Sequence, residues 1–150
     1  MVEIKTFGLL NLAQYMLFKE YRDKRYIIIS IKEAPYEDYG ISFTTQGGNC
    51  LGVLEMHFSD IDLSWDYSKY IERGELVLYS EEMAKEIVDF INEHIEKVDE
   101  ILIHCHAGAS RSVAVARAIE DYYGLKEFRG SKGLTNKYVY ELTYKALKRE

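Results

Sequence analysis

A run of large apolar residues over 26–31, broken only by Ser30, is apolar on both of its faces. A strand of this kind must be covered from two sides, as the central strand of a parallel sheet is. We predict further main strands over residues 51–58 and 101–104, and a short strand over 41–43. The spacing of apolar residues predicts helices over 9–19, 80–98, 110–123 and 134–148. Strands therefore alternate with helices, which predicts an α/β fold with a mostly parallel central sheet flanked by helices on both faces.

The length and composition restrict the class of protein. A chain of 150 residues that is 47% hydrophobic is expected to form a single domain over residues 1–150. With no basic-then-apolar start, no long apolar run and only two cysteines, we expect a cytoplasmic protein and no membrane association. The net charge of −6 argues against nucleic-acid binding. We expect a monomer.

The charge is unevenly distributed along the chain. Residues 1–123 carry 12 basic and 22 acidic side chains, whereas 124–150 carry 7 basic and 3 acidic ones. The basic end is either a solvated helix face or a rim that attracts an anionic substrate.

The most informative segment joins the predicted strand 101–104 to the predicted helix 110–123. It reads His104-Cys105-His106-Ala107-Gly108-Ala109-Ser110-Arg111-Ser112. A loop that leaves a sheet strand and enters a helix is a common anion site, because backbone N–H groups converge there. The nearby helix N-terminus and Arg111 favour the thiolate of Cys105, and the planar guanidinium suits two phosphate oxygens. Ser112 can donate its hydroxyl to the sulfur.

This segment resembles the signature of the cysteine-dependent protein tyrosine phosphatases, and most of all their compact dual-specificity branch. Cys105 and Arg111 are separated by five residues, with His104 before and Ser112 after. Residues 57–62 are similar to the segment that carries the family's general acid. The entry to the last helix fits too, although Thr135 stands where proline is frequent before Asn136. About residues 26–148 can be matched, with 66–79 as an insertion.

The resemblance implies a protein phosphatase that hydrolyses phosphotyrosine, with phosphoserine and phosphothreonine as further substrates, in phosphorylated proteins or peptides. Cys105 would be the nucleophile, Arg111 and Ser112 would assist it, and Asp60 would be the general acid. The phosphate would be bound by His106, Ala107, Gly108, Ala109, Ser110 and Arg111. His104 would support the loop, and neither a metal nor another cofactor is expected.

Several alternatives stay open at this point. Asp62 and Asp66 also follow the second main strand and compete with Asp60 for the role of the acid. An RNA 5′-triphosphatase shares the same loop, although the acidic first 123 residues disfavour it. Rhodanese-like or arsenate-reductase chemistry and a phosphotyrosine-binding pseudophosphatase are further alternatives. Asn136 is expected to be a structural cap or to form a hydrogen bond to a loop, and Trp65 is expected to be either an anchor for the aspartate loop or a core residue.

Overall fold

The computed structural model describes residues 2–18, 23–33, 41–45, 48–125 and 135–149. Its elements follow the order β1 (Glu3–Gly8), α1 (Leu9–Leu17), β2 (Tyr26–Lys32), β3 (Cys50–His57), α2 (Ser68–Glu72), α3 (Glu81–His94), β4 (Glu100–Cys105), α4 (Arg111–Tyr123) and α5 (Lys137–Arg149). Within these ranges, no helix has the length and apolar character that crossing a membrane requires.

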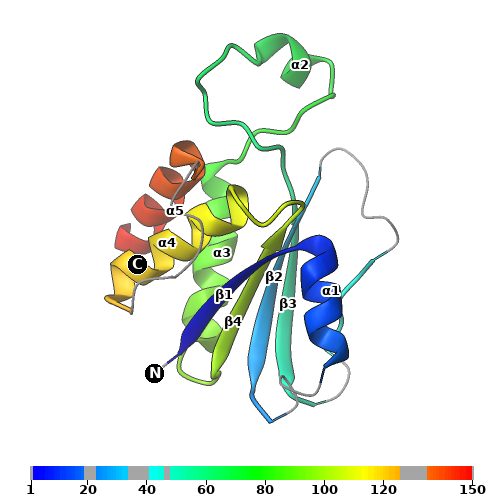
Figure 1. The fold of residues 1–150 in the computed structure, drawn as a ribbon. Coiled ribbons are helices and arrows are strands. Elements are labelled where there is room, and N and C mark those ends of the chain that lie inside the picture. Colours follow the sequence, from blue (N-terminus) through cyan, green and yellow to red (C-terminus); the bar gives the residue numbers. More distant parts are fainter. Residues whose placement is uncertain (1, 19–22, 34–40, 46–47, 126–134, 150) are drawn as a thin grey trace.

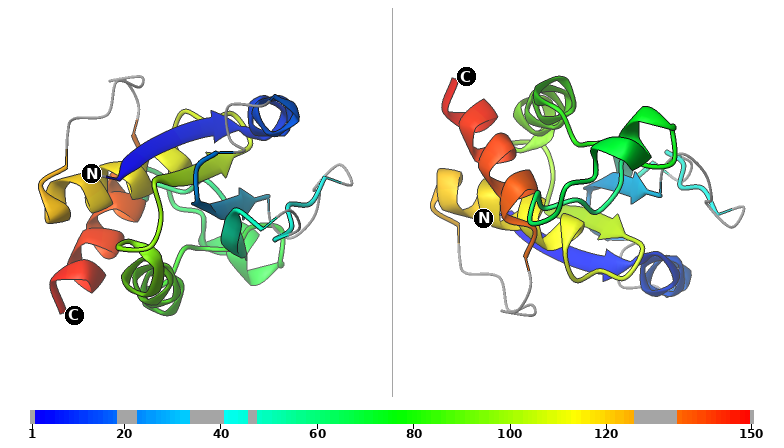
Figure 2. Two further views of the ribbon diagram at one scale, coloured as in Figure 1. Left: turned by 90° about the horizontal axis from the view of Figure 1, so that it is seen from below. Right: turned by 90° about the horizontal axis from the view of Figure 1, so that it is seen from above.

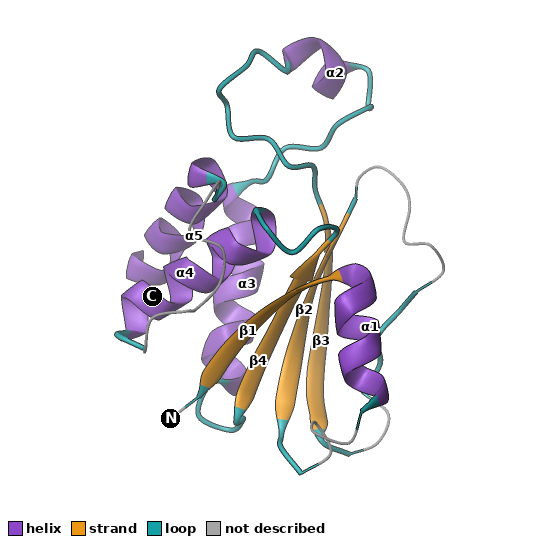
Figure 3. Ribbon diagram, in the orientation of Figure 1, coloured by secondary structure: helices purple, strands orange, loops and turns teal. Residues whose placement is uncertain are grey.

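The strands form one sheet in the order β1-β4-β2-β3, and every pair of neighbours is parallel. All carboxyl ends therefore meet at one edge of the sheet, at the top of Figures 1 and 3. Every residue of β2 is buried, which is the environment that the apolar run at 26–31 predicts. The expected α/β fold with a parallel central sheet is confirmed.

Helices cover the two faces of the sheet unequally (Figure 2). Alternate β2 residues such as Ile27 and Ile29 belong to the larger core, which includes side chains of α3, α4 and α5. Ile28, on the other face, packs in a smaller cluster with Leu12 of α1. This alternation follows from the two-residue period of a strand.

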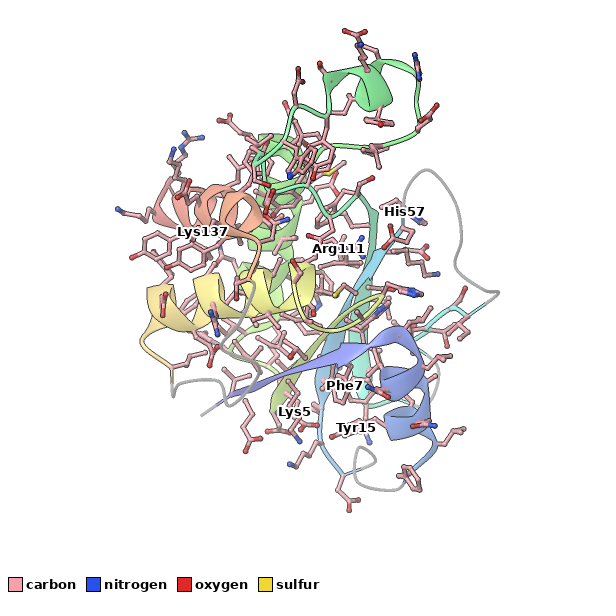
Figure 4. All side chains as sticks on the ribbon, turned by 45° about the horizontal axis from the view of Figure 1, so that its top comes forward. Lys5, Phe7, Tyr15, His57, Arg111 and Lys137 are labelled. Atoms are coloured by element: carbon pink, nitrogen blue, oxygen red, sulfur yellow. The ribbon has the colours of Figure 1, made fainter. Side chains whose placement is uncertain are left out.

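The N-terminal strand β1 is an element that the sequence pattern did not reveal. It pairs with β4 at the edge of the sheet, and most of its side chains are only partly buried. Lys5 of β1 forms a 2.6 Å ion pair with the buried Glu100 of β4. Figure 4 shows Lys5 at the end of the sheet opposite to Arg111. The sequence of β1 contains no long apolar run. The strand is therefore identified only by its hydrogen-bonded pairing with β4, which is distant in the sequence.

Other boundaries also differ from expectation. Residues 41–45 form no strand, so the short strand predicted at 41–43 is wrong. The helix predicted over 80–98 ends at His94, and Ser80 caps its start by accepting a hydrogen bond from the Met83 amide at 3.2 Å. Leu134, expected in the last helix, lies outside the described residues.

An excursion of the chain rises above the carboxyl edge of the sheet between β3 and α3 (Figure 1). Its neck is closed by Ser59 and Val77: the Ser59 amide donates to the Val77 carbonyl at 2.8 Å, and the Val77 amide donates to Ser59 Oγ at 2.9 Å. Above this neck lie residues 60–76, which we call the arm and which include the short helix α2. The insertion expected at 66–79 overlaps this arm, and Tyr79, at the end of that range, is buried against Phe58.

Candidate active site

The loop between β4 and α4 curls over the junction of β1 and α1. Gly108 has a φ of +75°, and a Cβ there would lie 2.4 Å from the Gly8 nitrogen and 2.5 Å from the Phe7 carbonyl carbon. The Leu9 amide donates to the His106 carbonyl at 3.1 Å. Only glycine fits at position 108, because the turn needs a left-handed conformation and the backbone of β1 passes so close.

The sulfur of Cys105 lies inside this curl. It accepts a hydrogen bond from the Gly108 amide at 3.2 Å and lies 3.2 Å from Ser112 Oγ. A thiolate can only accept, so Ser112 would then be the donor. Cys105 is 2% exposed, yet it lines an open cleft. The two contacts stabilise negative charge on the sulfur.

Arg111 is the first residue of α4 and is 3% exposed. Its Nη1 donates to the Phe58 carbonyl at 2.8 Å, and its Nη2 is paired with the carboxylate of Glu33. Among the described residues, Arg111 Nε has no hydrogen-bond partner although it is buried. Figure 4 shows Arg111 below the arm at the carboxyl end of the strands. The guanidinium is therefore held from two sides and retains a buried donor, as an anion site requires.

Asp60 stands at the root of the arm and is joined to the loop. Its Oδ1 accepts hydrogen bonds from Ser110 Oγ at 3.0 Å and from Asn136 Nδ2 at 2.8 Å. Asn136 also caps α5, since its Oδ1 accepts from the Val139 amide at 3.0 Å. The expected capping role of Asn136 is confirmed, and its hydrogen bond to Asp60 agrees with the other interpretation, a bond to a loop.

The other two candidate aspartates stabilise local turns of the arm. Asp62 Oδ1 accepts hydrogen bonds from the amide and hydroxyl of Ser64, and Asp66 Oδ1 does the same with Ser68. These hydrogen bonds, first of all those from the serine hydroxyls, lower the pKa of both carboxyls. Their partners belong to the arm itself, whereas Asp60 is hydrogen-bonded to Ser110 of the loop that carries Cys105, so the geometry favours Asp60 as the acid.

His104 lies beneath the loop and is fully buried. Burial lowers its pKa to about 4, so the ring is neutral at physiological pH. Its Nδ1 lies 3.3 Å from the Cys105 carbonyl, which can only accept. The proton is therefore on Nδ1, and Nε2 accepts from the Ser30 hydroxyl at 2.6 Å. His104 thus links the end of β4 to β2, in agreement with a supporting role.

Cys105, Arg111, Asp60 and Asn136 line one cleft of about 1270 Å³. The loop residues that line it are His106, Ala107, Ala109, Ser110 and Arg111, whereas Gly108 faces the β1–α1 junction. Trp65 and Tyr67 of the arm line the same cleft. Trp65 is 77% exposed, so both sequence interpretations, as an anchor and as a core residue, are wrong.

Sequence reasoning missed two residues that position the site, Gly8 and Glu33. Both follow strands, and the carboxyl ends of parallel strands meet at one edge. That rule could have pointed to Glu33, which directly follows β2. Gly8 could not be found in this way, because β1 itself was not recognised.

The second cysteine is remote from this cleft. Cys50 begins β3 beside Tyr26, and Tyr26 also pairs with Glu100 at the start of β4. Five residues of strand separate that level from Cys105, a rise of about 17 Å. A disulfide needs Cα atoms within about 7 Å, so the two cysteines cannot be joined in this fold.

Comparisons with known proteins give a match in structure. No model of a protein family matches the chain, and no curated protein does. Among solved structures, the chain is similar to the crystal structure of Tk-PTP in the active form, with a TM-score of 0.57 and 19% sequence identity. The match covers 100% of this chain and 95% of that chain. The chain therefore has a protein-tyrosine-phosphatase-like fold.

Proposed function

We propose that this chain is a cysteine-dependent phosphatase that hydrolyses phosphotyrosine in polypeptides, with phosphoserine and phosphothreonine as further substrates. The observation that carries the proposal is the buried Arg111 Nε, which has no partner among the described residues, in the cleft of Cys105. An unsatisfied buried donor costs about 1–3 kcal/mol. A phosphate oxygen would satisfy this donor, while the loop amides would receive the remaining charge.

In the first step, the Cys105 thiolate attacks phosphorus and forms the S–P bond. The bond between phosphorus and the leaving oxygen breaks, and Asp60 transfers its proton to that oxygen. Ser110 and Asn136 both donate to Oδ1 of Asp60, which supports Oδ2 as the oxygen that carries the proton. Arg111 would stabilise the equatorial oxygens of the five-coordinate phosphorus.

In the second step, a water molecule attacks the phosphocysteine and gives its proton to Asp60. The S–P bond breaks, inorganic phosphate is released, and Cys105 leaves as a thiolate. Ser112 would donate its hydroxyl to the leaving sulfur, consistent with the 3.2 Å separation of the two atoms. Asp60 is then protonated again, so the cycle needs no external co-reactant besides water.

The nucleophile is tested with p-nitrophenyl phosphate and a matched pair of variants. Cys105→Ser abolishes hydrolysis, whereas Cys50→Ser, at the opposite end of the sheet, retains it. Vanadate inhibits the wild-type protein, EDTA does not, and rapid quenching followed by mass spectrometry finds phosphate on Cys105. Activity that survives Cys105→Ser but is lost with EDTA would contradict the proposal. The cytoplasmic location and the monomeric state stay predictions made from composition.

A further inference from the structure

The arm exposes an unusual number of large apolar side chains above the candidate active site. Leu63 is 54%, Trp65 77% and Tyr70 49% exposed to solvent. Single exposed apolar residues are common on protein surfaces, whereas several on one short segment indicate a binding surface. The position of this segment then decides what it binds.

Trp65 and Tyr67 line the cleft that also holds Cys105 and Arg111. A substrate bound at Cys105 would therefore extend directly toward these two aromatic side chains. The cleft, of about 1270 Å³, exceeds the roughly 300–1,000 Å³ typical of small-molecule sites. A phosphate ester fills only part of it, so the remaining space suits the residues that flank a phosphorylated side chain in a polypeptide.

The backbone that carries Trp65 is held in place on both sides. Asp62 accepts hydrogen bonds from the amide and hydroxyl of Ser64, and Asp66 accepts the same pair from Ser68. The neck between Ser59 and Val77 closes the arm at its base. A surface that is ordered before binding loses less conformational entropy when a partner docks.

The charge of the arm restricts the partner further. Residues 60–76 carry five acidic and two basic side chains, which disfavours an RNA backbone near Trp65. We propose that the arm is a recognition element, and that Trp65 binds an apolar side chain beside the phosphorylated residue of a polypeptide. This inference rests on the proposed function and assigns its substrate class.

Binding can be measured without turnover, because Trp65 is the sole tryptophan of the chain. The probe is a phosphotyrosine peptide with leucines beside the phosphotyrosine, added to the full-length Cys105→Ser variant. We expect a saturable blue shift of the tryptophan fluorescence, since the exposed indole becomes covered. Free phosphotyrosine and inorganic phosphate occupy the loop without producing this shift. No shift with the peptide, or an equal shift with a triphosphorylated RNA oligonucleotide, would overturn the inference.

Kinetics with matched variants test the same contact in the active protein. Two phosphotyrosine peptides are compared, one flanked by leucine and one by glycine. The wild-type protein prefers the leucine peptide by about tenfold in kcat/KM, the scale of one aromatic–aliphatic contact. Trp65→Ala brings this ratio close to one. Phe18→Ala removes a similarly exposed aromatic side chain that follows α1 and does not line the cleft, so it keeps the wild-type ratio.

The outcomes separate this inference from the proposed function. Equal wild-type hydrolysis of both peptides, or an equal loss of preference in Phe18→Ala, overturns the role of Trp65 and leaves the phosphatase in place. A chain that hydrolyses neither peptide and no p-nitrophenyl phosphate contradicts the proposed function. Even then, the fluorescence shift decides whether Trp65 binds the peptide.

Discussion

Replacing Gly108 by alanine tests whether the loop is positioned by the β1–α1 junction. The new Cβ would approach the Gly8 nitrogen to 2.4 Å and the Phe7 carbonyl carbon to 2.5 Å. Both atoms belong to the backbone, which cannot move aside as the end of a flexible side chain can. Gly124 is a matched control, because its φ of +65° is similar and a Cβ there would meet nothing within 4 Å.

The two substitutions share the cost of a left-handed alanine, which is about 1–2 kcal/mol. Gly108→Ala adds an overpacking cost of about 1–3 kcal/mol, so its total reaches about 2–5 kcal/mol. In a domain of this size, 1 kcal/mol lowers Tm by roughly 2–4 °C. We therefore expect Gly124→Ala to lower Tm by roughly 2–8 °C and Gly108→Ala by roughly 4–20 °C.

Activity separates the two variants more sharply than stability does. The amide of residue 108 donates to the Cys105 sulfur, and a shift of the loop by about 1 Å can cost 100-fold in rate. Gly108→Ala should therefore lower kcat/KM for p-nitrophenyl phosphate about 100-fold, whereas Gly124→Ala keeps the wild-type value. Differential scanning calorimetry and initial rates measure both. If Gly108→Ala had the same Tm as Gly124→Ala and kept full activity, the close packing of residue 108 against the β1–α1 junction would be refuted.

Three further predictions concern the acid, its partner and the buried histidine. Asp60→Asn should slow a phosphotyrosine peptide by about 10²–10⁴-fold and flatten the alkaline limb of the kcat–pH profile; if Asp62→Asn does this instead, Asp62 is the acid. Asn136→Ala should lower kcat for the peptide more than for nitrophenyl phosphate and cost about 1 kcal/mol of stability through the lost helix cap; equal rate losses would argue against its link to Asp60. His104 is neutral in the folded state down to about pH 4, whereas the unfolded chain binds its proton below about pH 6.5. The free energy of unfolding should therefore fall by about 3 kcal/mol between pH 6.5 and 4, and urea titrations should show a smaller fall in His104→Gln.

The parts of the fold that the sequence predicts are those with a local signal. The buried strand β2 is visible because its residues are apolar on both faces, and the loop is visible because small residues separate Cys105 from Arg111. Ser80 identifies the start of α3 because a hydroxyl before a helical pattern is a frequent cap. Each of these signals lies within a few residues along the chain.

The features that were not predicted from the sequence depend on contacts between segments that are distant along the chain. The ion pairs of Lys5 with Glu100 and of Arg111 with Glu33 can form only when the sheet has assembled. The burial of Tyr79 also depends on a distant residue, because Phe58 packs against its ring. A single sequence does not show which distant residues will meet.

The root and the outer part of the arm have separable effects on the reaction. Asp60, at the root, is hydrogen-bonded to Ser110 of the loop and to Asn136 of α5. Both partners lie outside the arm, so the hydrogen bonds that orient Asp60, the proposed acid, do not involve Trp65. The indole lines the same cleft, and under the proposed function it would contact the part of the substrate that flanks the phosphate. Truncating Trp65 should therefore act mainly through KM, whereas removing the partners of Asp60 should act through kcat, and a Trp65→Ala variant with a normal KM and a reduced kcat would contradict this division.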